Sequence, residues 1–334
     1  MTTATEFSCQ LVERSEDGTV QIGPQQRPIK ELPAGNVVIR VLASSLNYKD
    51  ALAASGHPGI ARNLPHVPGI DAWGIVEHSD DEQFSVGQQV LMTGHELGVE
   101  RWGGWSEFIR VPADWVLPLP DGLTGRECMQ LGTAGFTAAQ CVLALQHHGV
   151  TPESGPVVVT GATGGVGTLS IMLLHKLGFH VIAVTGKADQ TDWLKARGAS
   201  EVQDRTLLKK SERPLLSAQF AGGIDTVGGE FLASLIKQIQ QRGCVASCGV
   251  AGGHELPLTV YPFILRGVTL AGIDSAWCPM PQRKEVWRLL ANEWKLSGLD
   301  EITQEIPLAE APHAAQEMLA GRATGRTVIR VSEE

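Results

Sequence analysis

The chain has 334 residues, of which 43% are apolar and 19% charged, and its formal net charge is −9. This length exceeds what one hydrophobic core usually sustains, so two domains are expected. The negative charge argues against a general affinity for nucleic acid or for anionic membranes. The N-terminal sequence is polar and no apolar run approaches membrane-spanning length, so neither a signal peptide nor a membrane span is predicted. Six cysteines lie scattered in mostly apolar surroundings, as in proteins of a reducing compartment. A soluble, cytoplasmic protein is expected.

The first third of the chain has β character. Its short apolar and β-branched runs lie between Gly, Pro and Asp residues, at 35–42, 74–77, 89–93, 105–111 and 115–118. Such regular short strands predict a compact, barrel-like β domain. Helical spacing of apolar residues over 127–145 then predicts a helix that leads into a second domain.

The middle of the chain alternates between predicted strands and predicted helices. The strands are expected at 157–160, 180–184, 201–202, 223–227 and 243–247, and the helices at 169–177, 191–197 and 231–240. This alternation predicts an α/β fold with a doubly wound parallel sheet, which binds ligands at the carboxyl ends of its strands. After Gly267 a strand, a helix and a last strand at 327–331 are expected, and the chain should return to the first domain.

A glycine-rich turn joins the strand at 157–160 to the following helix. Its sequence, TGATGGVG, matches the fingerprint G/A-x-G-x-x-G. The unpaired N–H groups and the positive dipole end of a helix N-terminus bind a diphosphate, so a dinucleotide cradle is predicted. A turn with a purely structural role is the alternative. The candidate contacts are Ala162, Thr163, Gly164, Gly165, Val166 and Gly167.

The next strand carries the signal for the choice of cofactor. NAD-binding proteins place a carboxylate near the adenosine ribose at the end of this strand. No Asp or Glu occurs between Thr168 and Ala188, whereas Thr185, Gly186 and Lys187 offer a hydroxyl, close backbone approach and a positive charge. NADP(H) is therefore predicted. A solvated Lys187 is the alternative, and Asp189 is expected to cap the following helix.

The segment Gly94-His95-Glu96 resembles the catalytic zinc segment of alcohol dehydrogenases. That chemistry commonly uses two cysteines and a histidine, but no cysteine lies near Asn47 and no closely spaced cysteine quartet exists. No metal site is predicted. Without a Lewis acid, reduction of an activated C=C bond becomes the natural alternative to alcohol oxidation.

Seven motifs together resemble those of zinc-independent medium-chain dehydrogenases/reductases, most closely the NADPH-dependent acryloyl-CoA reductase branch of the quinone oxidoreductases. The motifs are SSLNYKDALAASG (44–56), PGIDAWGIV (68–76), GWSEF (104–108), GTAGFTAA (132–139), TGATGGVG (160–167), DTVGG (225–229) and LRGVTLAGIDS (265–275). The resemblance implies a GroES-like catalytic domain at 1–126 and 267–334, a Rossmann NADP-binding domain at 127–266, and a homodimer.

The resemblance also implies an activity and its residues. NADPH-dependent reduction of an α,β-unsaturated acyl-CoA is expected, most closely acryloyl-CoA to propanoyl-CoA. Tyr48 should lie beside the nicotinamide, either as a hydrogen-bond donor or as a packing residue, with Asn47 and Asp50 ordering its loop. The further candidate contacts are Thr137, Val250 and Ser275 near the nicotinamide and Arg205, Arg266 and Arg326 for phosphates. For these arginines the alternative is a surface position without such a role. A quinone or enone reductase and a non-enzymatic NADPH sensor remain alternatives.

Overall fold

The computed structural model describes residues 5–333. It divides into two compact units. Unit 1 contains the chain up to Thr133 together with the chain from Ala276 onward, and unit 2 is Ala134–Ser275. The discontinuous organisation agrees with the expectation, but both boundaries lie further along the chain than the expected 126/127 and 266/267.

The structure gives a physical reason for each shifted boundary. The first lies inside helix α2 (Gly125–His147), which breaks at Gly132 with φ 51° and ψ −156°. The second follows strand β13 (Thr269–Gly272), which pairs in parallel with β12 (Ile239–Ser247) of unit 2. The expectation that the chain leaves the second domain at Gly267 is therefore wrong, because one more strand joins its sheet.

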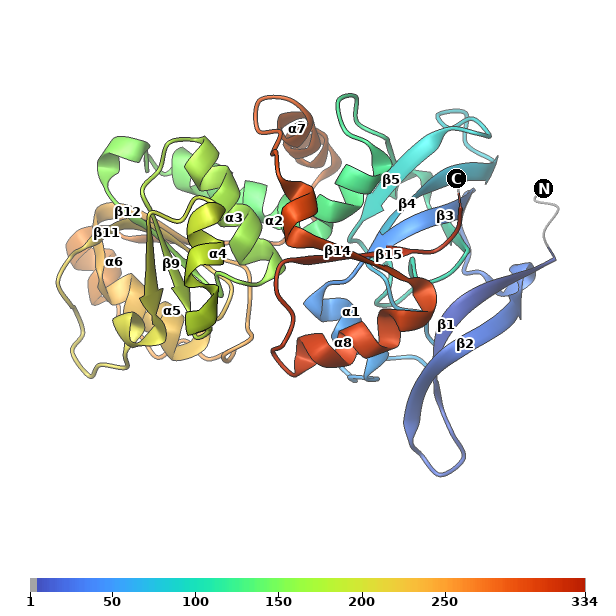
Figure 1. Cartoon of the computed structure of the whole chain (residues 1–334), viewed down its shortest axis with the longest axis horizontal. Helices are drawn as coiled ribbons and strands as arrows, with labels where there is room; N and C mark the ends of the chain where they lie inside the picture. The colour runs from blue at the N-terminus through green and yellow to red at the C-terminus, as the bar shows by residue number, and fades with distance from the viewer. Residues whose placement is uncertain (1–4, 334) are drawn as a thin grey trace. The chain divides into compact units, whose positions relative to one another are not determined.

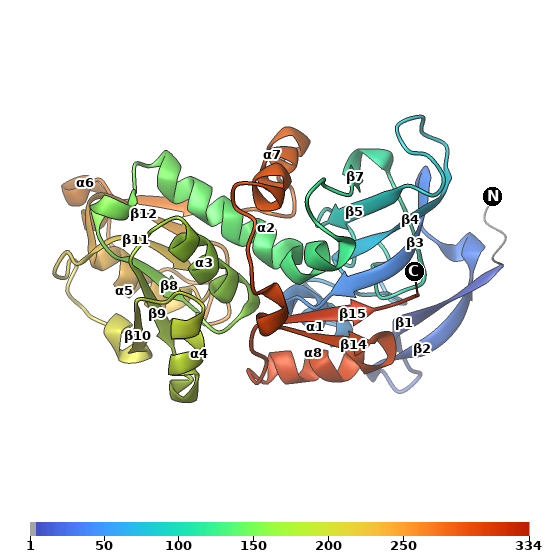
Figure 2. The same ribbon diagram turned by 45° about the horizontal axis from the view of Figure 1, so that its top comes forward.

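Unit 1 is built on a seven-stranded sheet with the order β14-β15-β3-β4-β5-β7, and β6 pairs with β3. Only β14 and β15 run parallel; the other pairs are antiparallel. Figure 2 shows β14 and β15 from the end of the chain beside β3 from its first part. The strands are β3 (Val37–Ser45), β4 (Asp71–Ser79), β5 (Gln89–Thr93), β6 (Phe108–Val111), β7 (Leu117–Pro118), β14 (Thr303–Pro307) and β15 (Arg326–Arg330).

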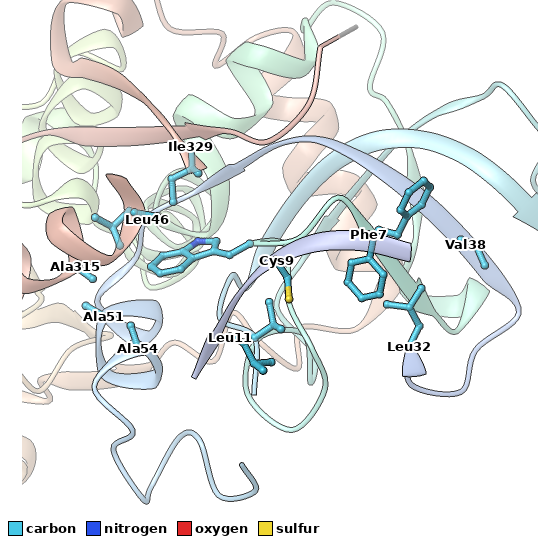
Figure 3. Packing of buried hydrophobic residues seen from close by; sticks show 14 residues of the cluster. Phe7, Cys9, Leu11, Leu32, Val38, Leu46, Ala51, Ala54, Ala315 and Ile329 are labelled. Atoms are coloured by element: carbon cyan, nitrogen blue, oxygen red, sulfur yellow. The ribbon is translucent and has the colours of Figure 1, made fainter. Parts of the chain in front are cut away.

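Strand β3 is the centre of this unit because both of its faces are buried. Val37, Ile39 and Val41 lie in one hydrophobic cluster, whereas Val38 lies in another. This division follows the two-residue period of a strand. The second cluster also includes residues of the helices α1 (Tyr48–Ala54) and α8 (Ala311–Leu319). Figure 3 shows Leu46, Ala51, Ala54, Ala315 and Ile329 of this cluster.

Sequence patterns missed several elements of unit 1. The sequence patterns do not predict the hairpin of β1 (Glu6–Arg14) and β2 (Val20–Pro28), because β2 is largely polar and exposed. Helix α1 was expected as a loop, since its seven residues are too few for a helical period to show. Helix α8 and strand β14 were not expected either.

Unit 2 contains the predicted doubly wound parallel sheet, with the strand order β10-β9-β8-β11-β12-β13. All strands are parallel, but from β8 the chain adds strands first toward one edge of the sheet and then, from β11, toward the other. The position between β8 and β11 is therefore the switch point at which such sheets bind ligands. Figure 1 draws this sheet and its helices in green to orange. The remaining strands are β8 (Val157–Thr160), β9 (Val181–Thr185), β10 (Glu201–Asp204) and β11 (Phe220–Asp225). The helices are α3 (Gly165–Lys176), α4 (Thr191–Ala196), α5 (Gly229–Lys237) and α6 (Tyr261–Arg266).

Two local expectations in unit 2 are wrong. Helix α5 ends at Lys237, not near Gln240, because Ile239 is already buried in the sheet as the first residue of β12. Asp189 does not cap the following helix. It lies within a short 3₁₀ turn, Ala188–Gln190, and its carboxylate accepts a hydrogen bond from the Gln190 side chain.

Helix α2 contradicts the expectation that no apolar run approaches membrane-spanning length. With 23 residues and a mean hydropathy of 1.3 over its most apolar window, it is long and apolar enough to cross a membrane. However, 78% of that window is buried inside the protein, as in the core helix of a soluble protein. The broken backbone at Gly132 also interrupts its regular hydrogen bonding.

Candidate active site

The glycine-rich turn of unit 2 forms an open helix N-terminus at the carboxyl end of β8. Helix α3 begins at Gly165, and no side chain caps it. The N–H groups of Gly165, Val166 and Gly167 precede the first intrahelical bond, which Thr168 N donates to Gly164 O at 2.9 Å. A side chain at Gly167 would overlap the Gly161 carbonyl oxygen, so close packing excludes any larger residue. This arrangement fits a dinucleotide diphosphate.

The turn itself depends on Gly161, which the fingerprint match did not include. Gly161 has φ 59°, whereas Ala162, assigned to the first fingerprint position, is buried. The Ala162 carbonyl accepts a hydrogen bond from Thr168 Oγ1 at 3.0 Å. The left-handed conformation favours glycine, and that requirement is the signal that could have identified Gly161 from the sequence.

Asp225 is a second residue that sequence reasoning missed. Its buried carboxylate accepts hydrogen bonds from Thr160 Oγ1 at 2.7 Å and from Gly228 N at 2.8 Å. Its carbonyl accepts a hydrogen bond from Cys248 N at 2.9 Å. Asp225 therefore ties together the ends of β8, β11 and β12, which line the switch point. Burial raises the pKa of this carboxyl.

Two cations meet at the end of β9. Lys187 follows Thr185, whose Oγ1 accepts a hydrogen bond from Lys187 N at 3.1 Å. Arg205 packs directly on Gly186, where any side chain would overlap its guanidinium. Partial burial, together with the positive charge of Arg205, lowers the pKa of Lys187, while Asp189 opposes this shift. Paired cations beside a glycine fit a ribose 2′-phosphate.

The other residues expected around the cofactor lie at different places in the fold. Thr137 is buried in helix α2, and Val250 is 63% exposed in the turn after β12. Ser275 is the last residue of unit 2.

Arg266 and Arg326 donate hydrogen bonds to backbone carbonyls of neighbouring segments. Arg266 donates hydrogen bonds to the carbonyls of Lys237, at 2.9 Å, and Ile239, at 3.1 Å. Arg326 is only 2% exposed, and its guanidinium donates to the carbonyls of Gln130, at 2.8 Å, and Leu46, at 3.2 Å. Neighbouring carbonyls therefore accept hydrogen bonds from both guanidinium groups, and the structure gives no support to the expected phosphate contacts of these two residues.

In unit 1, the segment Asn47–Asp50 is the start of helix α1 and not a loop. The Asp50 carboxylate accepts the N–H of Asn47 at 2.8 Å, as in a capping box. Its other oxygen accepts the backbone N–H groups of Gly69, at 3.1 Å, and Ile70, at 2.8 Å. Tyr48 is the first helical residue and is 45% exposed, so this anchored turn presents its side chain to the surface of the unit.

A second buried carboxylate, Asp71, lies next to the first. The Asn47 side-chain amide bridges the two, with Nδ2 at 3.1 Å from Asp50 Oδ2 and 2.8 Å from Asp71 Oδ2. Asp71 also accepts hydrogen bonds from Thr133 N at 2.9 Å and Thr133 Oγ1 at 2.6 Å. Arg326 supplies the positive charge, with Nη1 at 3.4 Å from Asn47 Oδ1. We call Asn47, Asp50, Asp71, Thr133 and Arg326 the buried polar network.

Gly69 and Gly132 allow this network to form. Gly69 has φ 109°, and a side chain there would come within 2.6 Å of Gly104 N. At Gly132 a side chain would lie 2.6 Å from Ser45 Oγ and 2.8 Å from Arg326 Nη2. The backbone at Gly69 and Gly132 therefore lies so close to its neighbours that a side chain at either position would displace atoms in or beside the network.

The pKa of Asp50 gives a test of this network. Burial and then the nearby Asp71 raise this pKa from 3.8 to about 7. A carboxyl whose pKa rises on folding stabilises the fold when protonated. This contribution is complete below pH 3.8 and is lost as the pH rises through about 7. The Asp50→Asn side chain cannot ionise. The difference in the free energy of unfolding, wild type minus variant, should therefore decrease as the pH rises from 3.8 to about 7. Urea titrations measure it, and a constant difference would contradict the raised pKa.

His95 lies in a setting of aromatic side chains. Its ring stacks on Trp115, with centroids 5.0 Å apart and planes 2° apart, and the edge of Trp277 lies 5.9 Å away. Burial and the charge of Arg283 lower the pKa of His95 from 6.5 to about 4. Within residues 5–333 no group of three or more His, Cys, Asp or Glu side chains is arranged to hold a metal ion.

Comparison with known proteins gives two family matches. Residues 33–121 match the family described as "Alcohol dehydrogenase GroES-like domain", and residues 165–292 match "Zinc-binding dehydrogenase". The chain is 46% identical to an Escherichia coli protein named "Probable acrylyl-CoA reductase AcuI", over 96% of this chain and 99% of that protein. It is 44% identical to the Bacillus subtilis "Putative quinone oxidoreductase YhfP", over 98% of this chain and 100% of that protein.

Solved structures agree with these matches. A Salmonella enterica oxidoreductase, yhdH, solved in complex with NADP, has a TM-score of 0.95 at 45% identity, covering 97% of this chain and 100% of that chain. The Bacillus subtilis yhfP structure, solved with NAD bound, also has a TM-score of 0.95, at 44% identity over 98% of this chain and 100% of that chain. The predicted fold class and family are confirmed. The chain belongs to the zinc-independent medium-chain dehydrogenases/reductases.

Proposed function

We propose that the protein uses NADPH to reduce the C=C bond of an α,β-unsaturated acyl-CoA, converting acryloyl-CoA to propanoyl-CoA. The observation that carries the proposal is identity of 46% and 42%, over nearly the full length, to relatives from Escherichia coli and Ruegeria pomeroyi that are both named as acrylyl-CoA reductases. The open helix N-terminus of α3 and the cation pair Lys187 and Arg205 fit NADPH. This cofactor supplies the hydride that the β-carbon of the substrate receives.

Tyr48 is the proposed proton donor. Hydride addition to the β-carbon leaves an enolate, whose oxygen needs a hydrogen-bond donor while the α-carbon takes a proton. Tyr48 is 45% exposed and belongs to a helical turn fixed by Asn47 and Asp50. These two side chains position the turn and do not exchange protons with the substrate in this proposal.

Tyr48→Phe removes only the hydroxyl, so it separates donation from packing. We expect kcat for acryloyl-CoA to fall about 100-fold with little change in stability, because a positioned acid contributes at least this factor. Steady-state NADPH oxidation and thermal unfolding measure the two effects. A variant with unchanged turnover would reduce Tyr48 to a packing residue.

A homodimer is proposed through one edge of the parallel sheet. Strand β13 ends the sheet order, and the neighbouring helix α6 exposes Ile264 (68%) and Leu265 (60%). An edge strand beside exposed apolar side chains is typical of an interface. Ile264→Lys should halve the mass measured by light scattering. The control is Val86→Lys, at a residue 71% exposed in unit 1, which should leave the mass unchanged. A dimeric Ile264→Lys protein would contradict this interface.

The proposed partners are small molecules, with no nucleic acid and no membrane, and the proposed location is the cytoplasm. The net charge of −9 supports the first part, since it disfavours polyanions. Five of the six cysteines are buried, which supports a reducing compartment.

The second candidate function is NADPH-dependent reduction of quinones or enones. It is favoured by the 44% identity to the Bacillus subtilis relative named as a putative quinone oxidoreductase. NADPH oxidation with acryloyl-CoA, crotonoyl-CoA, a free enone and a small quinone separates the candidates. We expect the highest kcat/KM with acryloyl-CoA. A quinone with the higher value would favour the second function, and cofactor binding without turnover of any substrate would indicate a sensor.

A further inference from the structure

The turns after three neighbouring strands meet at the switch point of unit 2. Strands β8, β11 and β12 lie next to one another in the parallel sheet, as Figure 2 shows. Strand β8 leads into the glycine-rich turn at 161–164, and β11 and β12 lead into turns at 226–228 and 248–253. Each half of a doubly wound sheet binds one mononucleotide of the cofactor, so the adenosine half of NADPH is expected over β8, β9 and β10 and the nicotinamide half over β11, β12 and β13.

Thr160, the last residue of β8, joins the first two of these turns. Its Oγ1 donates a hydrogen bond to Asp225 Oδ1 at 2.7 Å and accepts one from Thr226 N at 3.0 Å. Thr226 Oγ1 in turn donates to the carbonyl of Thr160 at 3.0 Å. A side chain at Gly161 would overlap Thr226 Oγ1, so the two turns are also in close contact. The other three residues of β8 are valines, which makes the Thr160 hydroxyl the polar exception in a fully buried strand.

Asp225 extends this connection to the turn after β12. Its carbonyl accepts a hydrogen bond from Cys248 N at 2.9 Å, and its Oδ2 accepts one from Gly228 N at 2.8 Å. The carbonyl of Val227 accepts a further hydrogen bond from Gly252 N at 2.7 Å. Backbone hydrogen bonds therefore hold the turns after β11 and β12 together, and the Asp225 side chain links both of them to β8.

The charge of Asp225 strengthens the connection. Burial raises the pKa of this carboxyl, whereas the hydrogen bonds from the Thr160 hydroxyl and the Gly228 N–H group lower it. These donors favour the ionised form, and an ionised carboxylate accepts stronger hydrogen bonds than a neutral amide does. We call Thr160, Asp225 and Thr226 the turn bridge.

We propose that the turn bridge positions the nicotinamide half of NADPH: it holds the turns after β11 and β12 in a fixed place relative to the glycine-rich turn, while the adenosine half binds without it. The three residues are positioning residues, because they act through the turns and not on the reacting atoms. This inference depends on NADPH as the cofactor and not on which substrate is reduced.

The test compares two ligands that share the adenosine half: NADPH and adenosine 2′,5′-bisphosphate, which lacks the nicotinamide half. Thr160→Val keeps the shape of the side chain and removes the hydroxyl that bonds to Asp225 and Thr226. We expect it to raise the Kd of NADPH about tenfold, the effect of one hydrogen bond to a charged group, and to leave the Kd of the bisphosphate within about twofold of the wild-type value. Isothermal titration calorimetry measures both constants.

A second variant and a control accompany this measurement. Thr226→Val removes the other hydroxyl of the bridge at a half-buried residue and should give the same pattern, so the test does not depend on the folding of one variant. The control is Ser234→Ala in helix α5, whose buried hydroxyl donates to Lys209 O at 3.0 Å and belongs to none of the three turns. It should leave both Kd values unchanged, and thermal unfolding compares the stability of all variants.

Each outcome decides the assignment. A raised Kd for NADPH alone supports it. Equal weakening of both ligands would overturn it, because the bridge would then hold the whole unit together. An unchanged Kd for NADPH in both threonine variants would overturn it as well. A wild-type protein that binds both ligands but reduces no acyl-CoA would instead contradict the proposed function and leave this assignment intact.

Discussion

Arg326→Met should lower the free energy of unfolding by about 3–5 kcal/mol, because it leaves the buried carboxylates of Asp50 and Asp71 without their cation. The substitution keeps much of the side-chain volume, so the loss reflects charge and hydrogen bonds more than packing. Three carbonyl or amide oxygens, at Leu46, Asn47 and Gln130, also lose the hydrogen bond from Arg326, and the Met129 carbonyl keeps the one from Ser45 Oγ. Urea unfolding at pH 7 measures the change.

Two further variants make this result specific. Arg330→Met lies in the same strand, β15, where the arginine side chain is 60% exposed, and it should cost less than about 0.5 kcal/mol. Adding Asp71→Asn to Arg326→Met should destabilise the protein by less than the sum of the two single changes, since it removes one of the unbalanced charges. Strict additivity would show that Arg326 does not balance Asp71.

The combined Lys187→Ala and Arg205→Ala substitution should raise the KM for NADPH about 1,000-fold and leave the KM for NADH nearly unchanged. Each cation in contact with a 2′-phosphate is worth about 2 kcal/mol, and NADH lacks this phosphate. Wild-type protein should prefer NADPH. Steady-state kinetics with NADPH and with NADH, using one alkene substrate, measure this change in cofactor preference.

The control for the cofactor experiment is Lys195→Ala, an exposed lysine of helix α4 in the same unit. It should leave both KM values unchanged. Equal weakening of NADPH and NADH in the double variant would indicate lost folding around Gly186 and not a lost phosphate contact. A wild-type preference for NADH would contradict the assignment of Lys187 and Arg205.

Much of the fold follows from patterns in the sequence. The buried strand at Val157–Thr160, the strand Gln89–Thr93 and the alternation of strands and helices in unit 2 depend on apolar runs and glycine turns, and both are local signals. Helix α1 and strand β2 did not show such signals. Contacts with distant parts of the chain stabilise α1, which packs against α8, so no local period could predict it.

The candidate site could be predicted only in part for the same reason. The glycine turn and Lys187 lie in short motifs with a recognisable order along the chain. Asp71 and Arg326, in contrast, meet Asn47 through pairings across the sheet of unit 1, and nothing near either residue in the sequence indicates this meeting. The sequence alone predicts a phosphate contact for Arg326, because the burial of an isolated arginine cannot be read from its neighbours in the chain.

The most direct test of the proposed reaction uses NADPH that carries deuterium at C4 of its nicotinamide. Incubation with acryloyl-CoA, followed by mass spectrometry and NMR of the product, should give propanoyl-CoA with deuterium at the β-carbon, while the α-carbon takes an unlabelled proton from Tyr48, which regains it from solvent. Absence of deuterated propanoyl-CoA, together with rapid NADPH oxidation by a quinone, would contradict the assignment as an acryloyl-CoA reductase.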